Sequence, residues 1–165
     1  MSVFEPIFDA LNQGGVRYVV VGGVATLLHG YARLTVDLDL VVDLSPSEAE
    51  KAIAVLTAIG LAPRVPVDAR EFADPAKRDA WMRERNMRVF TMIDPNNPLR
   101  QVDLFVESPI RFDDLWSRAE TIHLDSTDVR VASIPDLVEM KRRAGRPQDF
   151  VDIEALESIL ARRRR

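Results

Sequence analysis

The sequence contains no cysteine, only two histidines and no long apolar run. The absence of cysteine excludes a disulfide framework, a thiolate zinc site and a cysteine nucleophile, so any metal must be held by oxygen or imidazole ligands. No apolar stretch reaches the roughly 18 residues that a membrane-spanning helix needs. The first residues include Glu5 and Asp9, where a signal peptide would have basic residues. We therefore expect a cytoplasmic protein with no membrane partner.

Neither sign of charge dominates, because the chain has 26 acidic and 22 basic residues and a formal net charge of −4. Four of the basic residues form the run Arg162 to Arg165, which we expect to be solvated at a helix end. Without that run the rest of the chain would carry a net charge of −8 (−4 − 4), so it is a poor general binder of polyanions, and a nucleic acid would have to meet a local basic patch. The 165 residues predict one domain over 1–165, with a core over 17–132 and a C-terminal helical segment over 133–165.

Hydrophobic periodicity predicts strands and helices that alternate along the chain. Residues 17–21 form a β-branched run between two glycine pairs, typical of a buried strand, and a short helix follows until Gly30. A second strand is expected at 36–43, and Ser45 with Glu48 predicts a capping box for a helix through about residue 59. We expect a surface excursion at 61–86 with a helix at 77–85, and then an antiparallel hairpin formed by strands at 87–93 and 100–106. A helix is expected at 113–119 and short strands at 121–124 and 129–132. Two final helices follow, separated by residues 145–147. The predicted class is α/β (α+β): a mixed β-sheet with helices packed on one side and C-terminal helices that complete a pocket.

Two aspartates, Asp37 and Asp39, interrupt the apolar strand at 36–43. The chain has 16 aspartates, so about 1.6 Asp-x-Asp pairs are expected by chance, and the spacing alone is uninformative. Their setting is informative, because Asp is depleted from strands and a period of two places both carboxylates on one face. Two such charges repel each other in a poorly solvated place unless a cation neutralises them. Magnesium, which prefers oxygen ligands and accepts phosphates among them, is the natural candidate.

A third carboxylate, Asp103, lies in another apolar strand. Three carboxylates on adjacent strands can hold two metal ions roughly 3.5–4 Å apart, the arrangement that activates an attacking oxygen and stabilises a departing phosphate. The pair Gly22 and Gly23 leads into a helix N-terminus, where backbone N–H groups favour a triphosphate. These features together indicate phosphoryl or nucleotidyl transfer.

The order of these motifs resembles the nucleotidyltransferase superfamily related to DNA polymerase β, whose hallmark is a glycine pair, a D-x-D on the next strand and one later acid. The tail is similar to that of small bacterial members, including the AbiEii-type toxins of abortive-infection systems. The motifs that carry the resemblance are Val21-Gly22-Gly23, Arg33-Leu34-Thr35-Val36-Asp37-Leu38-Asp39-Leu40, Val102-Asp103-Leu104, and the tail from Leu137 to Lys141 and from Gly145 to Ile153.

The resemblance implies roles for the motif residues. Asp37, Asp39 and Asp103 would bind two Mg²⁺ ions, with Mn²⁺ as a substitute, and Asp103 would also help to deprotonate the acceptor hydroxyl. Gly22 and Gly23 would hold the triphosphate.

Three basic or polar residues join this candidate site. Lys141 ends the apolar face of a predicted helix, where a charge is awkward unless it reaches a site such as a phosphate. Arg33 and Thr35 precede the acids and would contact phosphate, with a salt bridge from Arg33 to Asp37 or Asp43 as the alternative. For Asp149 and Asp152 we expect a structural role in the first turn of the last helix, where acids favour the helix dipole, with an Asp149–Lys141 pair as the alternative.

The predicted activity is the transfer of a nucleoside monophosphate from a nucleoside triphosphate to a hydroxyl acceptor, with release of pyrophosphate. The acceptor is a tRNA end, a protein or a small molecule, and the resemblance adds a toxin–antitoxin partner protein. The alternative is a non-catalytic nucleotide-binding or antitoxin-like subunit on the same fold. A Rossmann dinucleotide domain is disfavoured, because G-x-G-x-x-G is absent and the three acids would be unexplained.

Overall fold

The protein, described over residues 3–165 by a computed structural model, contains one seven-stranded mixed sheet. Its strands are β1 (Tyr18–Val21), β2 (Leu38–Val42), β3 (Ala62–Pro63), β4 (Val89–Asp94), β5 (Asn97–Phe105), β6 (Glu120–His123) and β7 (Asp128–Val131). They lie in the order β3-β4-β5-β2-β1-β7-β6. β2 runs parallel to β5 and β1 parallel to β7, whereas the other neighbours are antiparallel. The mixed sheet and the β4–β5 hairpin confirm the sequence prediction.

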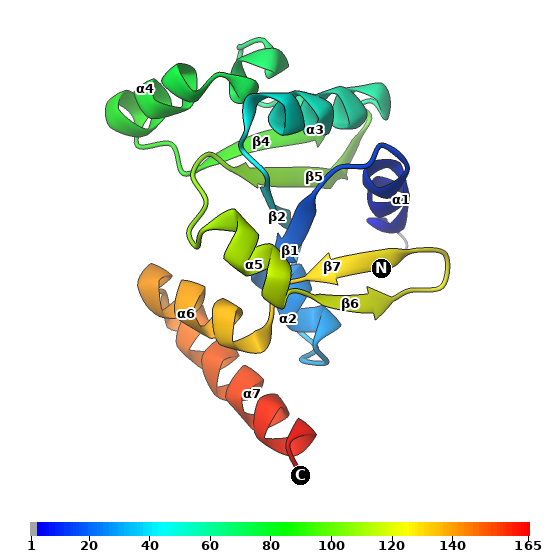
Figure 1. Ribbon diagram of the computed structural model, residues 1–165, viewed down its shortest axis with the longest axis vertical. Coiled ribbons are helices and arrows are strands. Elements are labelled where there is room, and N and C mark those ends of the chain that lie inside the picture. The colour runs from blue at the N-terminus through cyan, green and yellow to red at the C-terminus, as the bar shows by residue number, and fades with distance from the viewer. Residues whose placement is uncertain (1–2) are drawn as a thin grey trace.

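Helices flank the sheet at both ends and beside its middle strands (Figure 1). They are α1 (Glu5–Gln13), α2 (Gly22–Leu28), α3 (Pro46–Ala58), the 3₁₀ helix η1 (Ala69–Ala73), α4 (Pro75–Arg85), α5 (Phe112–Arg118), α6 (Ile134–Ala144) and α7 (Pro147–Arg163). In Figure 1, α3 and α4 lie beside β4 and β5, whereas α6 and α7 pack against each other at the opposite end. Over the described residues, no helix combines the length and apolarity that a membrane crossing requires.

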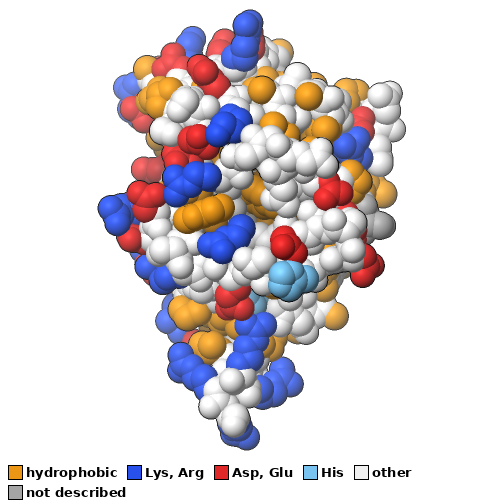
Figure 2. All heavy atoms as spheres, turned by 45° about the vertical axis from the view of Figure 1, so that its right-hand side comes forward, with side chains coloured by type: hydrophobic (Ala, Val, Ile, Leu, Met, Phe, Trp, Pro, Cys, Tyr) orange, Lys and Arg blue, Asp and Glu red, His pale blue; other side chains and the backbone are white. Residues whose placement is uncertain are grey.

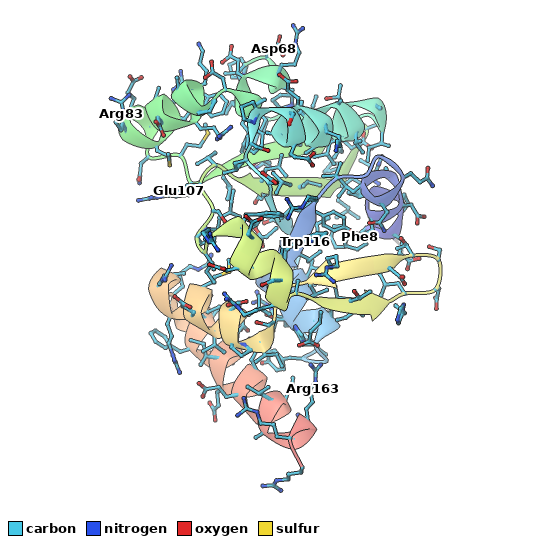
Figure 3. All side chains as sticks on the ribbon, viewed as in Figure 1. Phe8, Asp68, Arg83, Glu107, Trp116 and Arg163 are labelled. Atoms are coloured by element: carbon cyan, nitrogen blue, oxygen red, sulfur yellow. The ribbon has the colours of Figure 1, made fainter. Side chains whose placement is uncertain are left out.

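Aromatic residues fill the core on one face of the sheet. Phe8 of α1 stacks on Tyr18 of β1, with ring centroids 6.2 Å apart (Figure 3). Trp81 of α4 stacks on Phe90 of β4 at 5.2 Å, and the buried Phe72 of η1 packs on the same ring. The prediction of a surface excursion at 61–86 is therefore wrong in part, because this segment contributes core side chains that its many charges and prolines obscure in the sequence.

The second βα unit differs from the sequence prediction at the start of its strand and at the cap of its helix. β2 begins at Leu38, so Asp37 lies just before the strand rather than inside it. α3 begins at Pro46 as expected, but the capping box is absent, since the Ser45 side chain makes no capping hydrogen bond. Glu48 pairs instead with Lys51 at 2.8 Å, one turn further along the helix. The backbone N–H of Ser45, which the Glu48 side chain would accept in a capping box, donates to Oδ1 of Asp43 at 3.0 Å.

The two C-terminal helices, α6 and α7, form a helical hairpin and pack against each other. Gly145, in the left-handed conformation with φ +65°, ends α6 and allows the reversal into α7. Near the far end of α7, Arg163 contacts the buried His29 at 3.2 Å and Glu120 at 3.1 Å (Figure 3). Basic side chains gather at this end of the molecule, as expected for the exposed run 162–165 (Figure 2).

Candidate functional site

Strand register places two of the predicted acids side by side. β2 and β5 are parallel neighbours with Asp39 opposite Asp103, and β1 places Val21 opposite Asp39 on the other side. Directly opposed residues point to the same face of a sheet, so the two carboxylates share one face. Asp37 precedes Asp39 by two residues and faces the same pocket.

A pocket of about 530 Å³ opens on this face, between the sheet and helix α6. All eight residues that the sequence singles out border it: Gly22, Gly23, Arg33, Thr35, Asp37, Asp39, Asp103 and Lys141. The pocket also has an apolar wall, formed by Phe105, Pro109, Leu137 and Met140 among others. The lining therefore combines charged and apolar side chains, a composition typical of pockets for small molecules that carry both kinds of group.

The glycine pair at the start of α2 lets the backbone approach the acids closely. Gly22 has φ +67°, and a Cβ atom there would lie 2.1 Å from Oδ2 of Asp39. A Cβ atom on Gly23 would lie 2.5 Å from Oγ1 of Thr35. Both positions therefore require glycine, one for its conformation and both for space.

Burial and mutual repulsion perturb the two strand carboxylates. Burial, with the charges of Asp103 and Asp37, raises the pKa of Asp39 to about 7. Burial likewise raises the pKa of Asp103, and a hydrogen bond from Thr91 opposes that rise. Such neighbouring carboxylates favour a bound cation or a shared proton.

The donor chemistry of the three acids suits a hard cation, but their arrangement is incomplete. Among residues 3–165, no group of three or more His, Cys, Asp or Glu side chains could hold a metal ion as it stands. The three acids supply only oxygen donors, and the tight approach of Gly22 shows that Asp39 projects into the pocket beside the backbone. These features fit magnesium once the side chains adjust.

Lys141 borders the pocket and is paired there with two aspartates of α7. Its Nζ lies 2.7 Å from Oδ2 of Asp152 and 3.8 Å from Oδ1 of Asp149. Asp152 is fully buried, and its carboxylate also accepts hydrogen bonds from Arg33 and, at 2.9 Å, from Gln148. Burial alone would raise the pKa of Asp152, yet the bonds from Lys141 and Gln148 lower it below its usual value.

The structure gives the ion-pair partners of the basic residues. Arg33 pairs with Asp152 and not with the predicted partners, because Asp43 is held by Arg17 at 2.8 Å. The alternative of an Asp149–Lys141 pair is present only at 3.8 Å, and the shorter contact belongs to Asp152.

Sequence reasoning assigned Asp152 only to the helix dipole and overlooked Arg146. Arg146 borders the pocket, and its Nε donates to Oδ2 of Asp149 at 2.9 Å. The missed signal is the spacing of Asp149 and Asp152 along the buried stripe of α7, which continues through Ile153 and Leu156. Acids on a buried helix face need a cationic partner.

Comparison with known proteins gives one family and several structural neighbours. The family model described as "Nucleotidyl transferase AbiEii toxin, Type IV TA system" matches residues 8–163. A search of curated proteins gives no match. The lincomycin-bound lincosamide antibiotic adenylyltransferase LnuA superposes with a TM-score of 0.62 at 17% identity and covers 96% of both chains.

Two further structures share the fold. A putative nucleotidyltransferase from Thermotoga maritima gives a TM-score of 0.59 at 16% identity, with coverage of 98% of this chain and 92% of that one. The antibiotic-resistance factor ANT(2'')-Ia gives 0.55 at 12% identity, with coverage of 98% and 91%. At these identities the likeness establishes the fold alone.

Proposed function

Because the chain belongs to the AbiEii nucleotidyltransferase family of type IV toxin–antitoxin toxins, we propose that it is a magnesium-dependent enzyme that transfers a nucleoside monophosphate from a nucleoside triphosphate to a hydroxyl acceptor and releases pyrophosphate. The observation that carries this proposal is the convergence of three acids, a glycine pair and Lys141 on one pocket. A toxin–antitoxin partner protein belongs to the same proposal.

Asp37, Asp39 and Asp103 would hold the magnesium ions after a small adjustment of their side chains. The raised pKa of Asp39 supports this assignment, since burial and the charges of Asp103 and Asp37 raise it and a divalent cation would compensate both. Magnesium bound there would offset the charge of the carboxylates and phosphates and lower the pKa of a hydroxyl beside it.

The basic residues around the pocket would bind and orient the triphosphate. Lys141 and Arg33 are both held by Asp152, so their charged ends occupy fixed positions rather than sampling rotamers. Preorganised cations of this kind bind an anion at lower entropic cost. Gly22 and Gly23 leave space beside the acids, and the hydroxyl of Thr35 lies close to Gly23.

The acceptor hydroxyl would approach the carboxylate end of the pocket, where Asp103 accepts its proton. A carboxylate within reach of the attacking oxygen is the group that nucleotidyl transfer requires as a base. The acceptor class stays a tRNA end, a protein or a small molecule. The small-molecule class gains support from LnuA and from ANT(2'')-Ia, which was solved with adenylyl-2''-tobramycin.

Labelled nucleotides test the activity directly. We expect the wild-type protein, incubated with each labelled triphosphate, Mg²⁺ and a cell lysate, to label an acceptor, and Asp39→Asn to label none. The matched control is Asp125→Asn, which alters an exposed acid in the β6–β7 turn. Equal labelling by the wild type and Asp39→Asn would refute the assignment.

One observation favours the alternative of a non-catalytic nucleotide-binding subunit, namely that the described acids do not form a ready metal group. The two functions differ in a thermal-shift experiment combined with the labelling assay. A non-catalytic subunit would gain thermal stability from a triphosphate with Mg²⁺ and label nothing, whereas the enzyme would do both.

A further inference from the structure

We propose that Thr91 is a positioning residue for Asp103: its hydroxyl occupies one carboxylate oxygen and leaves the other for the ligands of the pocket. The inference rests on the proposed function and assigns a role to a residue that does not border the pocket. It follows from the arrangement of three adjacent strands, β4, β5 and β2.

Thr91 continues the row of residues that contains the acids. β4 and β5 are antiparallel, with Thr91 directly opposite Asp103, which in turn lies opposite Asp39 of β2. Thr91 Oγ1 donates to Oδ1 of Asp103 at 2.6 Å. Asp39, Asp103 and Thr91 therefore lie side by side on three neighbouring strands. The Thr91 hydroxyl contacts only one of the two carboxylate oxygens of Asp103.

A second donor reaches the same oxygen. Gln101 lies two residues before Asp103 on β5, is buried, and directs its Nε2 to Oδ1 of Asp103 at 3.5 Å. Arg64 donates to Oε1 of Gln101, which turns the amide nitrogen toward Asp103. The backbone N–H of Arg64 also donates to the carbonyl of Thr91 at 2.9 Å, so one residue braces both donors.

Both donors converge on Oδ1, and within residues 3–165 no hydrogen bond reaches Oδ2 of Asp103. A carboxylate anchored through one oxygen has a fixed plane, and its second oxygen remains available to a cation or to the proton of a hydroxyl. Partners behind a ligating group characteristically set its orientation in this way. Removal of the Thr91 hydroxyl should therefore make the Asp103 side chain more mobile while its negative charge stays in the pocket.

The test replaces Thr91 with two residues of similar shape. Thr91→Val keeps the β-branched side chain that suits a strand but removes the hydroxyl, and Thr91→Ser keeps the hydroxyl. Thr121→Val, on the exposed face of β6, is the matched control. Mn²⁺ affinity of the protein alone, measured by electron paramagnetic resonance, and kcat and KM for the triphosphate are the readouts.

We expect Thr91→Val to weaken Mn²⁺ binding and lower kcat by about 10- to 100-fold each, with little change in KM. Thr91→Ser and Thr121→Val should behave like the wild type, and Gln101→Met should show a smaller loss than Thr91→Val.

Wild-type values for Thr91→Val, or an equal loss in Thr91→Ser, would overturn the role of Thr91. A wild-type protein that neither binds Mn²⁺ nor transfers a nucleotide would instead refute the proposed function itself. If Thr91→Val fails to fold, Thr91→Ala, which also lacks the hydroxyl, takes its place, and the same comparison with Thr91→Ser decides the role of Thr91.

Discussion

Replacing Asp152 with Asn should destabilise the protein strongly, because Asp152 is the common acceptor for Lys141, Arg33 and Gln148. Its side chain is fully buried, and that of Lys141 is 7% exposed. Breaking a buried ion pair by removing one charge costs about 3–5 kcal/mol, since the remaining charge is left without compensation. Asp149 lies 3.8 Å from Lys141 Nζ and compensates in part. We therefore expect a loss near the lower end, about 3 kcal/mol.

The assay is urea denaturation at pH 7, with the free energy of unfolding taken by linear extrapolation. Glu157→Gln, which breaks the exposed pair with Arg142, is the matched control and should change stability little. The folded-state pKa of Asp152 is lowered, so its contribution is present at neutral pH and lost as the pH falls below the usual carboxyl range. The difference between wild type and Asp152→Asn should shrink accordingly in acid. An Asp152→Asn protein as stable as Glu157→Gln at pH 7 would refute the reasoning.

Two further changes probe the carboxylate end of the pocket. Gly22→Ala should abolish nucleotide transfer and cost about 1–3 kcal/mol in urea denaturation, because its φ is +67° and the new Cβ would overlap Oδ2 of Asp39. Gly60→Ala shares a positive φ with no atom within 4 Å and should keep full transfer, so equal activity in the two variants would contradict the close approach. Asp39 has a folded pKa of about 7, above its unfolded value, so the wild type should lose stability as the pH rises from about 4 to 7 in metal-free buffer. Asp39→Asn should remove that loss and be more stable than the wild type at pH 8, and a pH profile identical to the wild-type profile would show that Asp39 is not perturbed.

The local sequence pattern was sufficient to predict the helices and strands, but not to predict how each of them begins and ends. The apolar run that ends at Val21 and the glycines after it predict β1 and α2 with little ambiguity. The predicted capping box at Ser45 does not form, because the Ser45 backbone N–H donates to Asp43, a competing acceptor that the motif alone does not reveal. Trp81 is a buried core residue, although it lies in a helix whose other residues are mostly charged.

The site depends on contacts between distant segments, and these were only partly predictable. Asp39 and Asp103 are neighbours because β5 pairs in parallel with β2, a pairing that no local periodicity specifies. The dipole argument for Asp152 is local to α7, whereas its partners Lys141 and Arg33 come from α6 and from the segment before β2. Thr91 carries no sequence signal at all, because its relevance arises from cross-strand register.

The central claim is that three carboxylates bind magnesium beside a triphosphate, and a crystal structure with Mg²⁺ and a non-hydrolysable triphosphate tests it most directly. We predict two metal ions, with oxygens of Asp37, Asp39 and Asp103 about 2.0–2.1 Å from magnesium and the phosphates near Lys141. A triphosphate bound outside this pocket, or metal ions that leave Asp103 uncoordinated, would contradict the account.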